Sequence, residues 1–86
     1  LLTVGRIARD NGHGDLLRAL RELFREAPSL PLIWRVVGTG PEEGTLRRLV
    51  AEWGLESHVE FAGVVKNPYA EYRRANLFCL PSRTEG

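Results

Sequence analysis

Short apolar runs alternate with longer amphipathic stretches along this chain of 86 residues. The apolar runs are predicted strands and occupy residues 1–4, 33–37, 59–62 and 77–80. Strands that alternate with helical patterns are typical of βαβ units on a parallel sheet. The pattern therefore predicts an α/β fold with the element order β-α-β-α-β-α-β.

The amphipathic stretches carry signals for their own boundaries. Apolar residues recur at helical spacing over residues 16–27, and Pro28 ends that helix. Pro41 is expected as the first residue of the second helix, with Gly54 as its left-handed stop. Asn67 is expected to cap a third, shorter helix, with Pro68 in its first turn. Three helices thus connect the four strands.

Right-handed crossovers would place the turns that follow the strands along one rim of the sheet. Ligands of open parallel sheets bind at that rim. Arg6 lies in the first turn and Glu85 in the last, so the rim offers a fixed positive charge and a carboxylate. The turns begin at Gly5, Gly38, Gly63 and Pro81. Function is expected there.

Composition excludes several other classes of function. The net charge is +1 and the pI about 8.2, so bulk electrostatics give no reason to expect nucleic acid as a partner. No apolar run approaches the ~20 residues that span a bilayer. The single cysteine, Cys79, is expected to be a buried thiol in a cytosolic protein. There is no Asp-x-Asp motif, Gly-x-Ser-x-Gly elbow or Cys/His cluster, and no metal site is expected.

Other residues near the rim allow two interpretations. Gly38-Thr39-Gly40-Pro41 resembles a phosphate-binding turn, but a turn followed by a helix start explains it as well. Asn11 is expected to cap the first helix, whose free amides would point toward the ligand space. His13 is expected at the surface or beside the cap. Solvated helix faces best explain Arg18, Arg21, Arg25, Arg47, Arg48, Arg73 and Arg74.

Six short motifs, taken together, resemble a known family. They are Leu-Thr-Val-Gly-Arg, Gly-His before a helix, Val-Val-Gly-Thr-Gly-Pro, Val-Glu-Phe-Ala-Gly-Val, Tyr-Arg-Arg-Ala-Asn-Leu-Phe and Leu-Pro-Ser-Arg-Thr-Glu-Gly. In this order and spacing, over essentially the whole chain, they resemble the C-terminal, donor-binding domain of the GT-B retaining glycosyltransferases of family 4 (glycosyl transferases group 1). The resemblance implies a Rossmann-like parallel sheet with flanking helices.

The resemblance also implies roles for residues at the rim. Arg6, with Gly5, would contact the diphosphate of a nucleotide-diphosphate sugar. A lysine that normally follows five positions later and shares this contact is Asn11 here. Asn11 would still bind the donor through a hydrogen bond, but a charge is lost unless a neighbour such as Arg9 compensates. Backbone amides near Gly12 would help, and Val64 would lie near the nucleobase.

Glu85, followed by Gly86, matches the first glutamate of the family's E-x7-E motif, which approaches the donor sugar. The second glutamate would lie beyond residue 86. We therefore expect the chain to be the N-terminal part of the donor-binding domain, truncated within this motif and inactive alone. Arg6 and Glu85 are the expected catalytic residues.

The implied reaction is transfer of a sugar from a nucleotide-diphosphate donor to an acceptor hydroxyl with retention, without metal or another cofactor. The partners would be this donor and an unidentified acceptor, in the cytoplasm or peripherally at a membrane. A non-catalytic nucleotide-binding or regulatory module is the alternative, favoured by Asn11. A dehydrogenase domain is disfavoured, because no G-x-G-x-x-G follows the first strand.

Overall fold

The computed structural model describes residues 1–66, 70 and 73, and its strands and helices alternate as predicted. The predicted helix capped by Asn67 and the predicted strand at 77–80 fall outside the described residues, apart from positions 70 and 73. The described elements are β1 (Leu2–Val4), a 3-10 helix η1 (Arg9–Asn11), α1 (His13–Glu26), β2 (Trp34–Val37), α2 (Glu43–Glu52) and β3 (Val59–Gly63).

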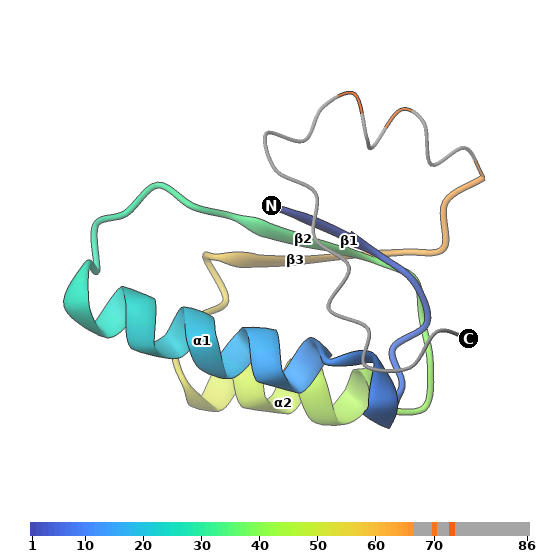
Figure 1. The fold of residues 1–86 in the computed structure, drawn as a ribbon, viewed down its shortest axis with the longest axis horizontal. Coiled ribbons are helices and arrows are strands. Elements are labelled where there is room, and N and C mark those ends of the chain that lie inside the picture. The colour runs from blue at the N-terminus through green and yellow to red at the C-terminus, as the bar shows by residue number, and fades with distance from the viewer. Residues whose placement is uncertain (67–69, 71–72, 74–86) are drawn as a thin grey trace.

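The three strands form one parallel sheet in the order β1-β2-β3. Val4 is opposite Val37, and Val37 is opposite Gly63, after an irregularity in the pairing of β2 with β3. Both helices cover the same face of this sheet and run side by side (Figure 1). The α/β class and the parallel sheet with flanking helices are thereby confirmed.

The core lies between the sheet and the two helices, and Trp34 of β2 is at its centre. Trp34 is fully buried, and its indole Nε1 donates a hydrogen bond of 2.9 Å to the hydroxyl of Thr3 on β1. This bond satisfies the polar atom that the large ring brings into the interior. The helices and the turn after α2 contribute Leu17, Leu20, Phe24, Leu46, Val50 and Leu55.

The ends of both helices follow local signals. Helix α1 ends at Glu26, and Pro28 follows two residues later, as predicted. Gly54 follows α2 with a φ of +67°, the left-handed conformation predicted for its stop. Glycine is favoured at this position because it has no Cβ to clash in the left-handed conformation.

The helix starts differ from the prediction. Helix α2 begins at Glu43, so Pro41 lies in the preceding turn rather than at the first helical position. The reason is a contact distant in sequence: the N–H of Glu42 donates a hydrogen bond of 3.0 Å to the carbonyl of Ile7. That bond holds the turn against the loop after β1, and the helix begins after it.

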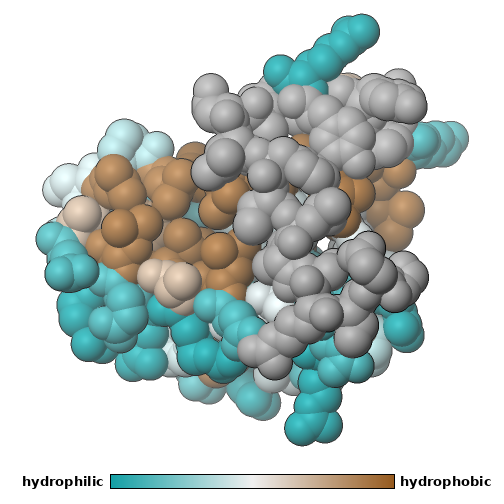
Figure 2. Space-filling model, in the orientation of Figure 1, coloured by the Kyte–Doolittle hydropathy of each residue, from teal (hydrophilic) through white to brown (hydrophobic). Residues whose placement is uncertain are grey.

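The outer surfaces of the helices are polar (Figure 2). All of the predicted solvated arginines that the structure describes are exposed, while Arg74 lies outside the described residues; the exposed ones are Arg18, Arg21, Arg25, Arg47, Arg48 and Arg73. Among the described residues, neither helix has the length and apolar character needed to cross a membrane.

Candidate functional site

The carboxyl ends of β1, β2 and β3 lie side by side and form the predicted rim. The N–H of Gly5 donates to the carbonyl of Val37 at 3.0 Å, and the N–H of Gly38 donates to the carbonyl of Gly63 at 2.7 Å. The turns after the three described strands are therefore joined by backbone hydrogen bonds. The fourth predicted turn, at Pro81, is outside the described residues.

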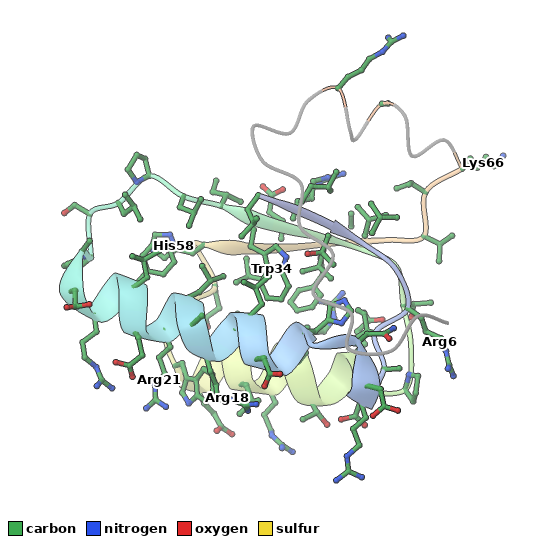
Figure 3. All side chains as sticks on the ribbon, in the orientation of Figure 1. Arg6, Arg18, Arg21, Trp34, His58 and Lys66 are labelled. Atoms are coloured by element: carbon green, nitrogen blue, oxygen red, sulfur yellow. The ribbon has the colours of Figure 1, made fainter. Side chains whose placement is uncertain are left out.

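Arg6 is exposed at this rim, although the residues on both sides of it are held firmly. Ile7 is almost completely buried, and its N–H donates to the carbonyl of Thr39 at 3.0 Å. Figure 3 shows the Arg6 side chain extending from the loop after β1, away from the sheet. Its guanidinium makes no hydrogen bond or ion pair with any other described residue, so its donors face solvent.

Asn11 closes the loop between β1 and α1, in a way that the sequence did not indicate. Its side-chain Nδ2 donates a hydrogen bond of 2.6 Å to the backbone carbonyl of Arg6. Asn11 is the last residue of η1, and Gly12, with a φ of +79°, takes the cap position of α1. The prediction that Asn11 caps the helix is therefore wrong, because its amide binds the carbonyl of Arg6 instead.

The glycines of the β2–α2 loop have a structural role. A Cβ at Gly38 would lie 2.0 Å from the carbonyl oxygen of Gly5, and one at Gly40 would lie 2.2 Å from that of Ile7. Both distances are far inside van der Waals contact, so only glycine lets the two loops pack this closely. The backbone carbonyls of the loop after β1 occupy this space. Close packing of the two loops therefore explains the two glycines, and a bound phosphate is not needed to explain them.

Helix α2 is joined to the rim by a polar chain. The Thr39 hydroxyl donates to Oε1 of Glu43 at 2.6 Å, and Arg47 donates to Oε2 of the same carboxylate at 2.9 Å. Two hydrogen bonds hold the pKa of Glu43 below its ordinary value: the one from the Thr39 hydroxyl has the larger effect, and the one from Arg47 comes next. The Arg47 guanidinium also lies 4.3 Å from the centre of the Phe61 ring, which joins α2 to β3.

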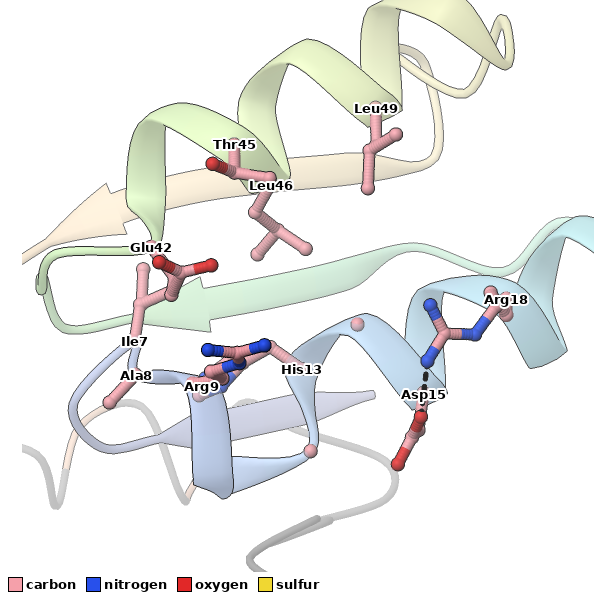
Figure 4. A pocket seen from close by; sticks show the side chains of 12 residues that line it. Ile7, Ala8, Arg9, His13, Asp15, Arg18, Glu42, Thr45, Leu46 and Leu49 are labelled. Atoms are coloured by element: carbon pink, nitrogen blue, oxygen red, sulfur yellow. Dashed lines mark hydrogen bonds and ion pairs between the residues drawn. The ribbon is translucent and has the colours of Figure 1, made fainter.

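A cavity of about 380 Å³ opens between the first turns of α1 and α2, next to the rim (Figure 4). Apolar side chains and several polar groups line it. The lining includes Ile7, Arg9, His13, Glu42, Thr45 and Leu46. Its mixed lining and its position beside Gly12 make it an extension of the candidate site.

His13, the first residue of α1, lies beside the cap residue Gly12, as one of the two expectations had it, but it lines this cavity and is only 4% exposed, so it is not at the surface. Its ring stacks near Trp34, with the two ring centres 6.2 Å apart. Neither ring nitrogen has a hydrogen-bond partner in the described part of the chain. Burial lowers the pKa of His13 from its usual 6.5, which favours the neutral imidazole. The sequence missed this because a histidine beside a cap carries no signal of burial.

Two further predicted contacts fall at or beyond the limit of the structure. Val64 follows β3 at the rim and is 76% exposed, which leaves it accessible to a ligand. Glu85 and Gly86 lie outside the described residues, so the structure does not place them against Arg6. Within the described residues, no three His, Cys, Asp or Glu side chains are grouped so that they could hold a metal ion.

Comparisons with known proteins agree with the fold. The chain is 34% identical over 88 residues to a GDP-mannose-dependent phosphatidylinositol monomannoside mannosyltransferase of Mycolicibacterium smegmatis. It is also 34% identical over 87 residues to a glycogen synthase of Deinococcus radiodurans. These alignments cover 100% and 99% of the chain but 22% and 18% of the two relatives, so it spans about a fifth of their length.

The crystal structure of the pneumococcal O-GlcNAc transferase, in complex with UDP and GlcNAc, matches with a TM-score of 0.75 and 26% sequence identity. The match covers 90% of this chain and 15% of that one. Residues 1–86 match the sequence model of one protein family, the glycosyl transferases group 1. With its parallel sheet, the arginine at the rim and a match over its whole length, the chain belongs to the glycosyl transferases group 1 family.

Proposed function

We propose that the full-length protein is a retaining glycosyltransferase that moves a sugar from a nucleotide-diphosphate donor to an acceptor hydroxyl. Residues 1–86 would form the N-terminal part of its donor-binding domain. The observation that carries this proposal is the placement of Arg6, which is solvent-exposed at the carboxyl ends of three parallel strands, on a backbone held at both sides. Ligands of such sheets bind at that end.

The chemistry of Arg6 suits the leaving group of this reaction. A guanidinium presents several N–H donors in a fixed plane and pairs strongly with phosphate oxygens. When the bond from the anomeric carbon to the diphosphate breaks, negative charge develops on the diphosphate, and a cation already in place stabilises it. The first amides of α1, after Gly12, lie near the same loop and favour an anion.

The remaining roles are proposed from the family resemblance. Glu85, with Gly86, would orient the donor sugar, and Val64 would contact the nucleobase. Donors with uridine and with guanosine both have support, because one relative is named GDP-mannose-dependent and the solved relative holds UDP. We further propose that no metal is required, since Arg6 supplies charge at the diphosphate. The single Cys79 fits a cytoplasmic reaction.

The test uses the full-length protein and measures release of the nucleoside diphosphate from a panel of UDP- and GDP-sugars. Arg6→Ala and Glu85→Gln should each lower kcat/KM at least tenfold for the preferred donor. Arg25→Ala is the matched control, because this arginine is also exposed but lies near the far end of α1. NMR of the product should show the anomeric configuration of the donor, and a chelator should leave the rate unchanged.

The alternative of a non-catalytic nucleotide-binding module predicts a different result. UDP or GDP would then bind, and Arg6→Ala would weaken that binding, but no donor in the panel would be turned over. A protein that neither binds these nucleotides nor turns over any donor would contradict both functions.

A further inference from the structure

We propose that Asn11 is a positioning residue, which holds the backbone of Arg6 so that its guanidinium faces the donor diphosphate, and that Asn11 does not contact the donor itself. This inference rests on the proposed function. It replaces the role of donor contact expected for Asn11 from the sequence.

The side-chain amide of Asn11 is bound to the protein backbone. Its side-chain Nδ2 lies 2.6 Å from the carbonyl oxygen of Arg6, five residues earlier in the chain. The same oxygen accepts a second hydrogen bond of 3.1 Å from the N–H of Ala8. The amide group of Asn11 is therefore directed at the protein backbone, and its contact at that end is already made.

This contact of Asn11 helps to fix one peptide unit of the loop. The carbonyl of Arg6 and the N–H of Ile7 belong to one planar peptide group. Asn11 and Ala8 hold the oxygen, while the N–H donates to the carbonyl of Thr39 at 3.0 Å. With both polar atoms of a rigid plane held, the backbone torsion ψ of Arg6 is set. This torsion determines how the rest of the loop is oriented relative to the Arg6 side chain.

The backbone before Arg6 is anchored at Gly5. The N–H of Gly5 donates to the carbonyl of Val37 at 3.0 Å, which attaches the end of β1 to β2. The residues on both sides of Arg6 are therefore hydrogen-bonded to β2 and to the loop that follows it. The side chain of Asn11 adds the contact to the carbonyl of Arg6 itself. Because the guanidinium has no partner of its own among the described residues, its direction depends on its backbone and on solvent.

The chemistry of asparagine suits this role. Its short side chain has few rotatable bonds and a neutral amide donor, so it can order a loop at a low cost in conformational entropy. A lysine would offer a point charge on a long, flexible stem. A short neutral amide at position 11 therefore suits the ordering of the Arg6 backbone better than a lysine would.

The experiment is a double-mutant cycle in the full-length protein, with UDP and GDP as probes in calorimetric titrations. Asn11→Ala should weaken binding of the preferred nucleotide roughly threefold to tenfold, the range of one hydrogen bond. In the Arg6→Ala background, the same substitution should change the affinity by less than about 1.5-fold, because Asn11 acts only through Arg6.

Two conservative variants separate positioning from general damage to the fold. Asn11→Asp has the same size but cannot donate to the Arg6 carbonyl, and it should lose at least as much affinity as alanine. Asn11→Gln keeps the amide donor on a longer arm and should recover part of the loss. Ser57→Ala, an exposed hydroxyl deletion outside the loop, is the matched control and should leave the affinity unchanged.

The outcomes are distinct. Losses that multiply in the Asn11→Ala, Arg6→Ala double variant would mean that Asn11 acts independently of Arg6 and would overturn this inference alone. If Arg6→Ala by itself left nucleotide affinity unchanged, the proposed diphosphate site would fail, and the positioning role with it.

Discussion

The two loops that follow β1 and β2 lie against each other at the rim, yet they have different roles. The β1–α1 loop presents Arg6 to solvent, and Asn11 closes it through a side-chain hydrogen bond. The β2–α2 loop has two glycines with no room for a Cβ, because the backbone of the first loop fills the space beside Gly38 and Gly40. One loop carries the candidate chemistry, and the other supports it.

The difference shows how a glycine-rich turn can be misjudged. Gly38-Thr39-Gly40-Pro41 has the appearance of a phosphate cradle, but its glycines are explained by contact with protein carbonyls. A carbonyl oxygen facing the glycine is an acceptor, and an anion would be repelled at that place. The candidate for anion binding lies in the neighbouring loop, where the exposed guanidinium of Arg6 has no partner among the described residues.

The largest expected effect comes from breaking the supporting loop. In Gly38→Ala, the new Cβ would meet the Gly5 carbonyl at 2.0 Å, at a φ of +129° that side chains rarely adopt. We expect a loss of about 3 kcal/mol or more in the free energy of unfolding, measured by urea denaturation of the full-length protein. A variant as stable as the wild type would show that the two loops do not need this close approach.

A smaller effect, on binding alone, is expected in the loop that carries the chemistry. Arg6→Ala should leave the free energy of unfolding within about 0.5 kcal/mol of the wild type, because the side chain is exposed and unpaired among the described residues. Its affinity for the preferred nucleoside diphosphate should fall at least tenfold, or about 1.4 kcal/mol. A loss of stability similar to that of Gly38→Ala would remove the distinction between the loops.

His13, at the start of α1 between the two loops, should make stability depend on pH. Burial lowers its pKa in the folded protein, so the unfolded chain takes up a proton first as the pH falls below 6.5. The free energy of unfolding should therefore decrease from pH 7 to pH 5, by at most about 1.4 kcal/mol per pH unit from this residue. Its contribution is constant above the unfolded pKa.

The matched variant for this test is His13→Phe, which keeps an aromatic ring near Trp34 without a titratable group. Urea denaturation at several pH values should show a shallower decline for the phenylalanine variant. Equal slopes for the two proteins would contradict the neutral, buried imidazole.

The smallest effect is expected at a glycine that neither loop uses. Gly44 lies in α2, and a Cβ there would meet nothing within 4 Å. Gly44→Ala should therefore raise the free energy of unfolding by roughly 0.5–1 kcal/mol, since alanine favours the helix and restricts the unfolded chain. A destabilised Gly44→Ala would mean that replacing any glycine in this region is harmful. The loss of stability in Gly38→Ala could then no longer be attributed to its contact with the Gly5 carbonyl.

Much of the fold could be predicted because its signals are local. The spacing of Leu17, Leu20 and Phe24 predicts the buried face of α1, and Pro28 and Gly54 mark the ends of the two helices. The rim, with Arg6 at it, followed from the alternation of strands and helices together with the right-handed crossover of parallel strands. The helix faces and helix ends depend on residues within a few positions of one another.

The sequence by itself therefore determined the order of the described strands and α-helices, the parallel sheet and the end of the sheet at which Arg6 lies. The tertiary structure alone decided that Gly38 faces the Gly5 carbonyl, that Asn11 binds the Arg6 backbone instead of capping α1, and that His13 is buried near Trp34. The physical reason is distance. Periodicity reports which face of an element is apolar, whereas these contacts exist only after separate elements have packed and their loops have met.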